Sequence, residues 1–417
     1  MILLFLFTCI ELIVFSFFNP ISELQQYFFV IINIVVLIFI IQRSYPEYKT
    51  ILMLGLILRL VLLIIDYNKI FPILHSGVDT ETFNAYATIN ALNGNIDSGR
   101  TSYNIILSSL YILLGPSRLI AQYVNVLFGM GVLIFLYKIF KELKLSKKNE
   151  RTGLIIAAFF PHLIIFSGIL LREAWCQFFV TVSLYYFIKW IKSNNFSFFI
   201  VSIAAVLGAS WMHAGCLFVG VGYLTALIFY KVKKKKSEVT FGSLVIFMVA
   251  IIAITAFMTL TDSFTEKIDN FNEEDMKDTG LYGNIKGKSA YLLWINPNST
   301  TQLLIFAPLK MFYFMFSPIP MDWRGFQDVV AFLFDSLIYF FLVFAIFKNY
   351  KRIRDPLKKN IFKYIIISIV FFCFVFGYGT TTSGTAIRHR CKLFPLVLTA
   401  YAISVSEKRK YMTVHKV

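Results

Sequence analysis

The chain has 417 residues, of which 58% are hydrophobic and only 15% charged, with a mean hydropathy of +0.71 and a net charge of +17. About a quarter of the residues in soluble proteins are charged, so this composition excludes a soluble chain, a disordered chain and a small disulfide-built module. The basic excess does not indicate nucleic-acid binding, because it clusters between apolar runs long enough to cross a membrane.

These apolar runs can each cross a hydrocarbon core of ~30 Å as a helix that rises ~1.5 Å per residue. They predict an all-α polytopic membrane protein with about 12 transmembrane helices, in a single membrane domain over residues 1–417. The candidate spans are 2–18, 25–42, 50–66, 118–140, 153–170, 173–191, 196–212, 214–230, 240–261, 328–347, 361–379 and 392–405.

Basic clusters orient these spans. With this assignment they all fall on one side, which the positive-inside rule makes cytoplasmic together with both termini. The clusters begin at Arg43, Lys141, Lys189, Lys231, Lys348 and Lys408. The assignment requires that residues 103–114 and 303–316 do not cross fully, so we expect both to form re-entrant or interfacial helices on the outer face.

Two large segments, 66–117 and 261–327, then lie outside, where we expect the function to reside. Residues 262–300 are rich in acids and contain a glycine-rich part. This stretch is interpreted either as a mobile lid or as a solvated connector.

The first polar motif follows the third span. Asp79 and Glu81 lie two residues apart after Gly77, and such a pair can hold a cation or take a proton from a hydroxyl. The structural alternative is the first turn of a helix, where acids favour the dipole.

The second motif runs from Pro161 to Glu173, where one span reaches the outer face and the next begins. Ionisable groups among apolar neighbours commonly mark a site. Arg172 is the stronger candidate, because Glu173 also suits a helix start and is expected to orient Arg172 through an ion pair.

The third motif places Arg388, His389 and Arg390 after a hydroxyl-rich outer loop. Guanidinium groups match phosphate oxygens with paired hydrogen bonds, so we interpret the cluster as a diphosphate site, with anionic lipid headgroups as the alternative ligand.

Isolated polar residues add further candidates. His213 lies at a helix-helix turn, where a structural role is the alternative, and Arg324 follows Trp323, an interfacial anchor. Arg59 and Asp335 lie inside spans, and the sequence leaves open whether they pair with each other or with site residues.

Four patterns together resemble a known class of proteins: the acids after early spans, a P-x-x-x-x-x-S-x-x-x-x-R-E turn, a P-I-P-x-x-W loop and a G-x-x-x-R-x-R-x-x-x-x-P helix. They comprise Asp79 and Glu81; Pro161, Ser167, Arg172 and Glu173; Pro318, Pro320 and Trp323; and Gly384, Arg388, Arg390 and Pro395. The constellation resembles bacterial O-antigen and capsule repeat-unit polymerases of the Wzy type and, more distantly, the GT-C class of polyprenyl-phosphate-dependent glycosyltransferases.

The resemblance implies a GT-C-like fold and a glycosyltransferase that polymerises polyprenyl-diphosphate-linked repeat units at the external face of the bacterial cytoplasmic membrane. The acids follow the third span here, whereas GT-C enzymes carry theirs after the first, which favours the polymerase. We expect catalysis by Asp79, Glu81, Glu173 and His213, and substrate binding by Arg172, Arg388, His389, Arg390 and Arg324.

The expected partners are the polyprenyl-linked oligosaccharide, membrane lipid and other polysaccharide-assembly proteins, with no nucleic acid. No cofactor and no metal are expected, with a divalent cation at Asp79 and Glu81 as the alternative. A GT-C transferase using polyprenyl-phosphate sugar and a flippase for lipid-linked oligosaccharides are the alternative functions, and an acyltransferase using His162 ranks below them.

Overall fold

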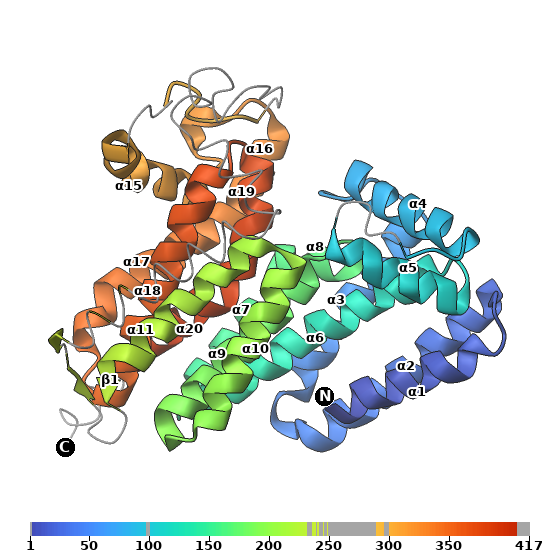
Figure 1. Ribbon diagram of the computed structural model, residues 1–417, viewed down its shortest axis with the longest axis horizontal. Coiled ribbons are helices and arrows are strands. Elements are labelled where there is room, and N and C mark those ends of the chain that lie inside the picture. Colours follow the sequence, from blue (N-terminus) through green and yellow to red (C-terminus); the bar gives the residue numbers. More distant parts are fainter. Residues whose placement is uncertain are drawn as a thin grey trace. The chain divides into compact units, whose positions relative to one another are not determined.

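A computed structural model describes residues 2–96, 101–231, 236–238, 240–241, 245, 248, 289–295 and 300–406 (Figure 1). The chain divides into two compact units. Unit 1 comprises Met1–Tyr186 and Ile200–Cys216, and unit 2 comprises Phe187–Phe199 and Leu217–Val417.

Unit 1 is helical, and two of its helices, α9 and α10, lie partly in unit 2. The helices of unit 1 are α1 (Ile2–Ser16), α2 (Glu23–Ser44), η1 (Pro46–Tyr48), α3 (Lys49–Tyr67), α4 (Val78–Leu92), α5 (Ser102–Leu114), α6 (Arg118–Glu142), α7 (Lys147–Phe159), α8 (Pro161–Gly168), α9 (Glu173–Ser193) and α10 (Phe196–Met212).

The centre of unit 1 is α6, in which 94% of the most apolar 18-residue stretch is buried inside the protein. The helices α2, α3, α7 and α8 pack against it. Glycines permit close approach: a Cβ at Gly129 would lie 2.1 Å from Oγ of Ser167 in α8, and one at Gly168 would lie 3.2 Å from the backbone nitrogen of Leu63 in α3.

The segment between the third and fourth predicted spans folds into a hairpin of α4 and α5, which lie side by side (Figure 1). Nδ2 of Asn90 donates to Oγ of Ser108 at 2.9 Å, and the hydroxyl of Tyr111 donates to Oδ1 of Asn84 at 2.7 Å. The apolar stretch predicted at 103–114 is therefore a helix of 13 residues.

Unit 2 contains helices and one two-stranded antiparallel sheet. Its elements are η2 (Ala214–Phe218), α11 (Val219–Phe229), β1 (Tyr230–Lys231), β2 (Lys236–Ser237), α15 (Thr300–Phe316), η5 (Pro320–Asp322), α16 (Phe326–Ala331), the π-helical segment η6 (Phe332–Ser336), α17 (Leu337–Asn349), η7 (Tyr350–Arg352), α18 (Pro356–Gly379), α19 (Ser383–Arg390), η8 (Cys391–Leu393) and α20 (Phe394–Val405).

Within unit 2, α18 packs against α11, α15 and α20, and α17 packs against α20. Gly222 allows one of these contacts, because a Cβ there would lie 2.2 Å from the carbonyl oxygen of Tyr364. In the same contact Oγ of Ser368 donates to the carbonyl of Val219 at 2.7 Å.

Helices occupy every predicted span except 240–261, which lies mostly outside the described residues. The predicted lid at 262–300 also lies outside the described residues, apart from residues 289–295 and 300. Five helices in the described part of the chain are long and apolar enough to cross a membrane: Glu23–Ser44, Pro46–Tyr67, Arg118–Glu142, Phe326–Arg352 and Pro356–Gly379. The all-α membrane class is confirmed at this level, while the count of twelve spans and the GT-C-like fold stay predictions.

One predicted span is not continuous. Residues 153–170 form α7 and α8, which are bent by 49° where Pro161 begins the second helix. Proline has no N–H and cannot continue the hydrogen-bond ladder of α7. Together these two helices would make a sixth span.

Candidate functional site

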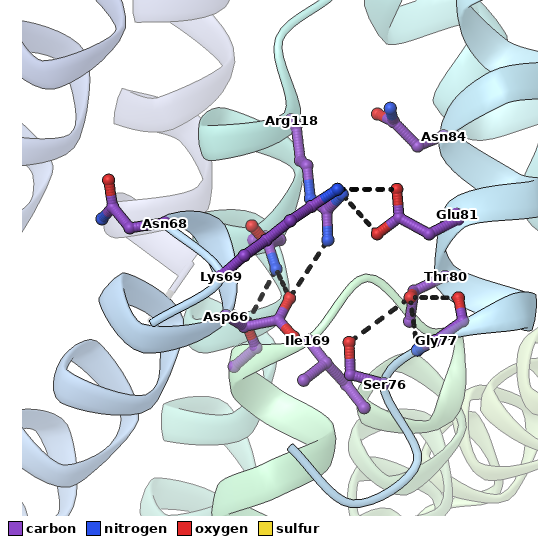
Figure 2. Close-up of polar contacts among 12 residues, drawn as sticks. Asp66, Asn68, Lys69, Ser76, Gly77, Thr80, Glu81, Asn84, Arg118 and Ile169 are labelled. Atoms are coloured by element: carbon purple, nitrogen blue, oxygen red, sulfur yellow. Dashed lines mark hydrogen bonds and ion pairs between the residues drawn. The ribbon is translucent and has the colours of Figure 1, made fainter. Parts of the chain in front are cut away.

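A network of charged and amide side chains joins the end of α3 to α4 and to the start of α6 (Figure 2). Arg118, at the first position of α6, contacts two carboxylates. Its Nη1 lies 2.8 Å from Oε1 of Glu81, and its Nη2 lies 3.3 Å from Oδ2 of Asp66. Lys69 approaches the other oxygen of Glu81 at 3.6 Å.

The charges of this network are unequally exposed. The side chains of Asp66 and Arg118 are 4% and 13% exposed, whereas that of Glu81 is 46% exposed. Burial acts to raise the pKa of Glu81, but the hydrogen bond and charge of Arg118, with help from Lys69, outweigh it and hold the pKa below its usual value. Glu81 is therefore ionised at neutral pH and is a weak base.

The predicted acidic motif forms the first turn of α4, as in the structural alternative considered for it. Oγ1 of Thr80 accepts from the backbone N–H of Gly77 at 3.0 Å, which fixes the start of the helix. Gly77 has φ +150°, a conformation that side chains rarely adopt. Asp79 is exposed at this turn, whereas Glu81 faces Arg118.

The same face of α6 holds the turn between α8 and α9. Nε2 of Gln122 donates to Oδ2 of Asp66 at 2.5 Å and to the carbonyl of Gly168 at 3.2 Å. One turn further, Nδ2 of Asn125 donates to the carbonyls of Ile169 and Leu171 at 2.7 and 2.9 Å. Gln122 and Asn125 therefore fix the backbone that leads into Arg172.

Arg172 is half-buried at the end of this turn, and its Nε is buried without a hydrogen-bond partner in the part of the chain that the structure describes. Glu173 begins α9, as predicted, and is fully buried. The expected ion pair between Arg172 and Glu173 stays a prediction. The hydrogen bonds from Gln122 and Asn125 hold the turn that leads into this pair of residues.

Histidines lie in two further places of unit 1. The rings of His75 and His162 are 5.6 Å apart, and His162 is 1% exposed. His213 follows α10, and its carbonyl accepts from the backbone N–H of Cys216 at 2.9 Å, so it lies at the helix-helix turn predicted for it.

In unit 2, Arg390 is fully buried at the end of α19. Its Nε donates to Oδ2 of Asp335 at 2.6 Å, its Nη1 to the carbonyl of Phe314 at 3.2 Å, and its Nη2 to Oγ of Ser336 at 3.0 Å. The sequence did not determine which residue pairs with Asp335, and in the structure its partner is Arg390, one of the predicted site residues. These contacts tie α19 to α15 and to the π-helical segment η6.

The neighbours of Arg390 in α19 are more accessible. Arg388 and His389 are both half-buried. Nδ1 of His389 lies 2.8 Å from Nζ of the buried Lys392, and its ring packs on Phe376 with centroids 4.8 Å apart. The predicted basic cluster thus contains one guanidinium that is enclosed by protein and two groups that are partly exposed.

The loop that carries Arg324 is connected to the start of α19. Nη2 of Arg324 donates to the carbonyl of Ala290, and Ala290 forms an antiparallel bridge with Thr382, the N-cap of α19. Burial raises the pKa of the nearby Asp322, and the charge of Arg324 opposes this rise. Unit 2 thereby brings Arg324 and the Arg388–Arg390 helix into one local assembly.

The predicted residues therefore form two groups. Unit 1 links Glu81 through Arg118, Asp66 and Gln122 to the turn that precedes Arg172, and unit 2 links Arg324 to α19. The convergence of Arg172 with Arg388 and Arg390 on one cavity stays a prediction. Among the described residues no group of three or more His, Cys, Asp or Glu is arranged to hold a metal ion.

Sequence reasoning missed Asp66, Arg118, Gln122 and Asn125. A signal was present, because positions 118, 122 and 125 are spaced four and three residues apart and so lie on one face of a helix. Three polar residues on one face of an otherwise apolar span indicate a polar contact surface.

Comparison of the chain with protein-family models, with curated proteins and with solved structures found no match.

Proposed function

We propose that the protein is a membrane glycosyltransferase that polymerises oligosaccharide repeat units carried on a polyprenyl diphosphate. The reaction needs cations that stabilise the departing diphosphate and a base that takes a proton from the acceptor hydroxyl. The observation that carries the proposal is the arrangement around Arg172 in unit 1. There Arg172 is half-buried, and its Nε has no hydrogen-bond partner among the described residues. It follows a turn that hydrogen bonds link to a carboxylate network.

Arg172 is the proposed diphosphate ligand of unit 1. The turn that precedes it is held by Gln122 and Asn125, so the guanidinium is presented from a fixed position. Fixed donors stabilise developing charge without reorganising in the transition state. Arginine also offers two parallel hydrogen bonds to a phosphate, which lysine does not.

Asp79 is the proposed general base. It is exposed at the first turn of α4, next to the network, while Glu81 is ion-paired with Arg118 and Lys69. The pKa of Glu81 lies below its usual value, which makes it a poor proton acceptor. We assign Glu81 to positioning α4, and Glu173, fully buried, to positioning α9.

In unit 2, Arg388, His389 and Arg324 are the proposed contacts to the second lipid-linked substrate. Arg324 is exposed, and Arg388 and His389 are half-buried. Arg390 is assigned a positioning role, because its hydrogen bonds to Asp335, Ser336 and Phe314 use both edges of the guanidinium. We place this activity at the external face of the bacterial cytoplasmic membrane, with both termini in the cytoplasm.

The test uses purified protein in liposomes with a polyprenyl-diphosphate-linked oligosaccharide. We expect ladders of chains that contain several repeat units, and we expect Arg172→Lys to abolish them. Arg151→Lys is the matched control, since Arg151 is exposed on α7. Addition of one sugar from a polyprenyl phosphate would favour the GT-C transferase, and movement of the lipid-linked glycan without new bonds would favour a transporter.

A further inference from the structure

Arg59 is a fully buried cation within α3, one of the apolar helices long enough to cross a membrane. Its Nη1 donates to the carbonyl of Gly55 in its own helix at 2.8 Å and to the carbonyl of Ala158 in α7 at 3.4 Å. Nε and Nη2 have no hydrogen-bond partner within the described ranges. Among the described residues, the hydrogen bonds of this guanidinium therefore go to backbone carbonyls.

Small residues make the space that Arg59 occupies. A Cβ at Gly129 of α6 would lie 3.1 Å from Nε of Arg59, and a Cβ at Gly55 would lie 3.4 Å from Nη1. The distance at Gly129 is tighter than ordinary contact, so a side chain there would press on the guanidinium, whereas a Cβ at Gly55 would be in van der Waals contact with it. The packing of α3, α6 and α7 is thus built around this arginine.

The carbonyl that Arg59 contacts belongs to a broken helix end. Pro161 provides no N–H for the carbonyl four residues before it, and Phe160 is extended, with φ −66° and ψ 117°. A new series of helical hydrogen bonds begins in α8, where the N–H groups of Leu163 and Ile164 donate to the carbonyl of Phe160. The last carbonyls of α7 therefore lack their helical donors.

We infer that Arg59 is a positioning residue that caps the broken end of α7 and so fixes the direction of α8 and of the turn that presents Arg172. Apolar surroundings make both an uncapped carbonyl and a buried cation unfavourable, and their contact relieves both. The negative end of the α7 dipole adds to the attraction, partly offset by the start of α8 one residue later. The catalytic consequence rests on the proposed function, whereas the structural part does not.

Distance measurements test the structural part. Spin labels at Arg151→Cys and Arg172→Cys, with the exposed Cys9 replaced by Ser, report where the end of α8 lies relative to α7. Arg59→Met should broaden the distance distribution and shift it, by up to ~10 Å if the 49° bend of a helix about 12 Å long were to straighten. Arg59→Lys, which keeps a cation and donors, should largely restore it.

Two controls make this measurement specific. Arg43→Met, at an exposed arginine of α2, should leave the distances unchanged. In a Pro161→Ala background the ladder of α7 can continue, so that Arg59→Met should shift the distances less than in the parent protein. Unchanged distances in Arg59→Met alone would overturn the inference, as would equal shifts in Arg59→Met and Arg59→Lys.

Turnover tests the catalytic consequence. If Arg172 binds the diphosphate, Arg59→Met should lower kcat/KM by about a hundredfold, the loss typical of a misplacement of about 1 Å, and Arg59→Lys should recover most of it. Normal turnover in a variant with shifted distances would remove the link to Arg172. No turnover in the parent protein, together with the distance shift, would refute the proposed function and leave the capping role standing.

Discussion

Replacing Asp335 with alanine tests whether the buried charge pair of unit 2 holds α19 in place. Both side chains of the Asp335–Arg390 pair are 0% exposed, so this change leaves a buried guanidinium whose remaining hydrogen-bond partners among the described residues are Ser336 and the carbonyl of Phe314. Removing one member of a buried pair typically destabilises a protein by about 3–5 kcal/mol. We expect a loss of that size in the free energy of unfolding.

The measurement is the unfolding of detergent-solubilised protein, followed by circular dichroism as denaturing detergent is added. Lys69→Met is the matched control, because its pair with Glu81 is 69% and 46% exposed and such pairs contribute about 0–1 kcal/mol. Asp335→Leu combined with Arg390→Met should be less destabilising than Asp335→Ala, since no charge is left buried. A loss below about 1 kcal/mol in Asp335→Ala would refute the assignment of Arg390 to positioning.

Two further predictions concern α4. Asp79→Asn should remain folded and bind the lipid-linked repeat unit but lower the rate of polymerisation by ~10²–10⁴-fold, as measured by chain length and single-turnover kinetics; a normal rate would show that Asp79 is not the base. Because the folded-state pKa of Glu81 is lowered, its ion pairs should contribute stability above the unfolded pKa of about 4.3, and this should disappear as the pH falls through the folded value. The stability difference between the parent protein and Glu81→Gln should be below about 1 kcal/mol at pH 7 and vanish in acid; a difference that grew in acid would contradict the assignment.

Hydropathy predicted where the helices lie because a span must satisfy its backbone internally and bury apolar side chains. It also identified the outer acids, the Arg172 turn and the α19 arginines as polar exceptions. It did not identify the bend in the span 153–170, although Pro161 was visible, because a proline is also tolerated in membrane helices when neighbouring groups satisfy the freed carbonyls.

The sequence did not predict which side chains contact one another. Arg390 and Asp335 are 55 positions apart and meet because the fold of unit 2 brings the end of α19 to the π-helical segment η6. Arg118 likewise reaches Asp66 and Glu81 through the packing of α6 on α3 and of the α4–α5 hairpin. Such contacts depend on the rotation and height of each helix, which hydropathy leaves undetermined.

The turn before Arg172 depends most directly on Asn125. Its amide donates to the carbonyls of Ile169 and Leu171, and its Oδ1 accepts from Nε1 of Trp175 at 2.8 Å. Asn125→Asp preserves the shape and the bond from Trp175, but places a carboxylate oxygen against two carbonyl oxygens. Each carbonyl left unsatisfied in a buried place is unfavourable by about 1–3 kcal/mol.

We therefore expect Asn125→Asp to be at least as destabilising as Asn125→Ala, although aspartate is the closer match in shape. A spin label at Arg172→Cys should become more mobile in Asn125→Asp, because the backbone on which it stands is no longer held. Asn95→Asp, at an exposed position after α4, is the control for the change in charge. If Asn125→Asp left both the free energy of unfolding and the label unchanged, the turn would be fixed by other groups, and the argument that α6 presents Arg172 would fail.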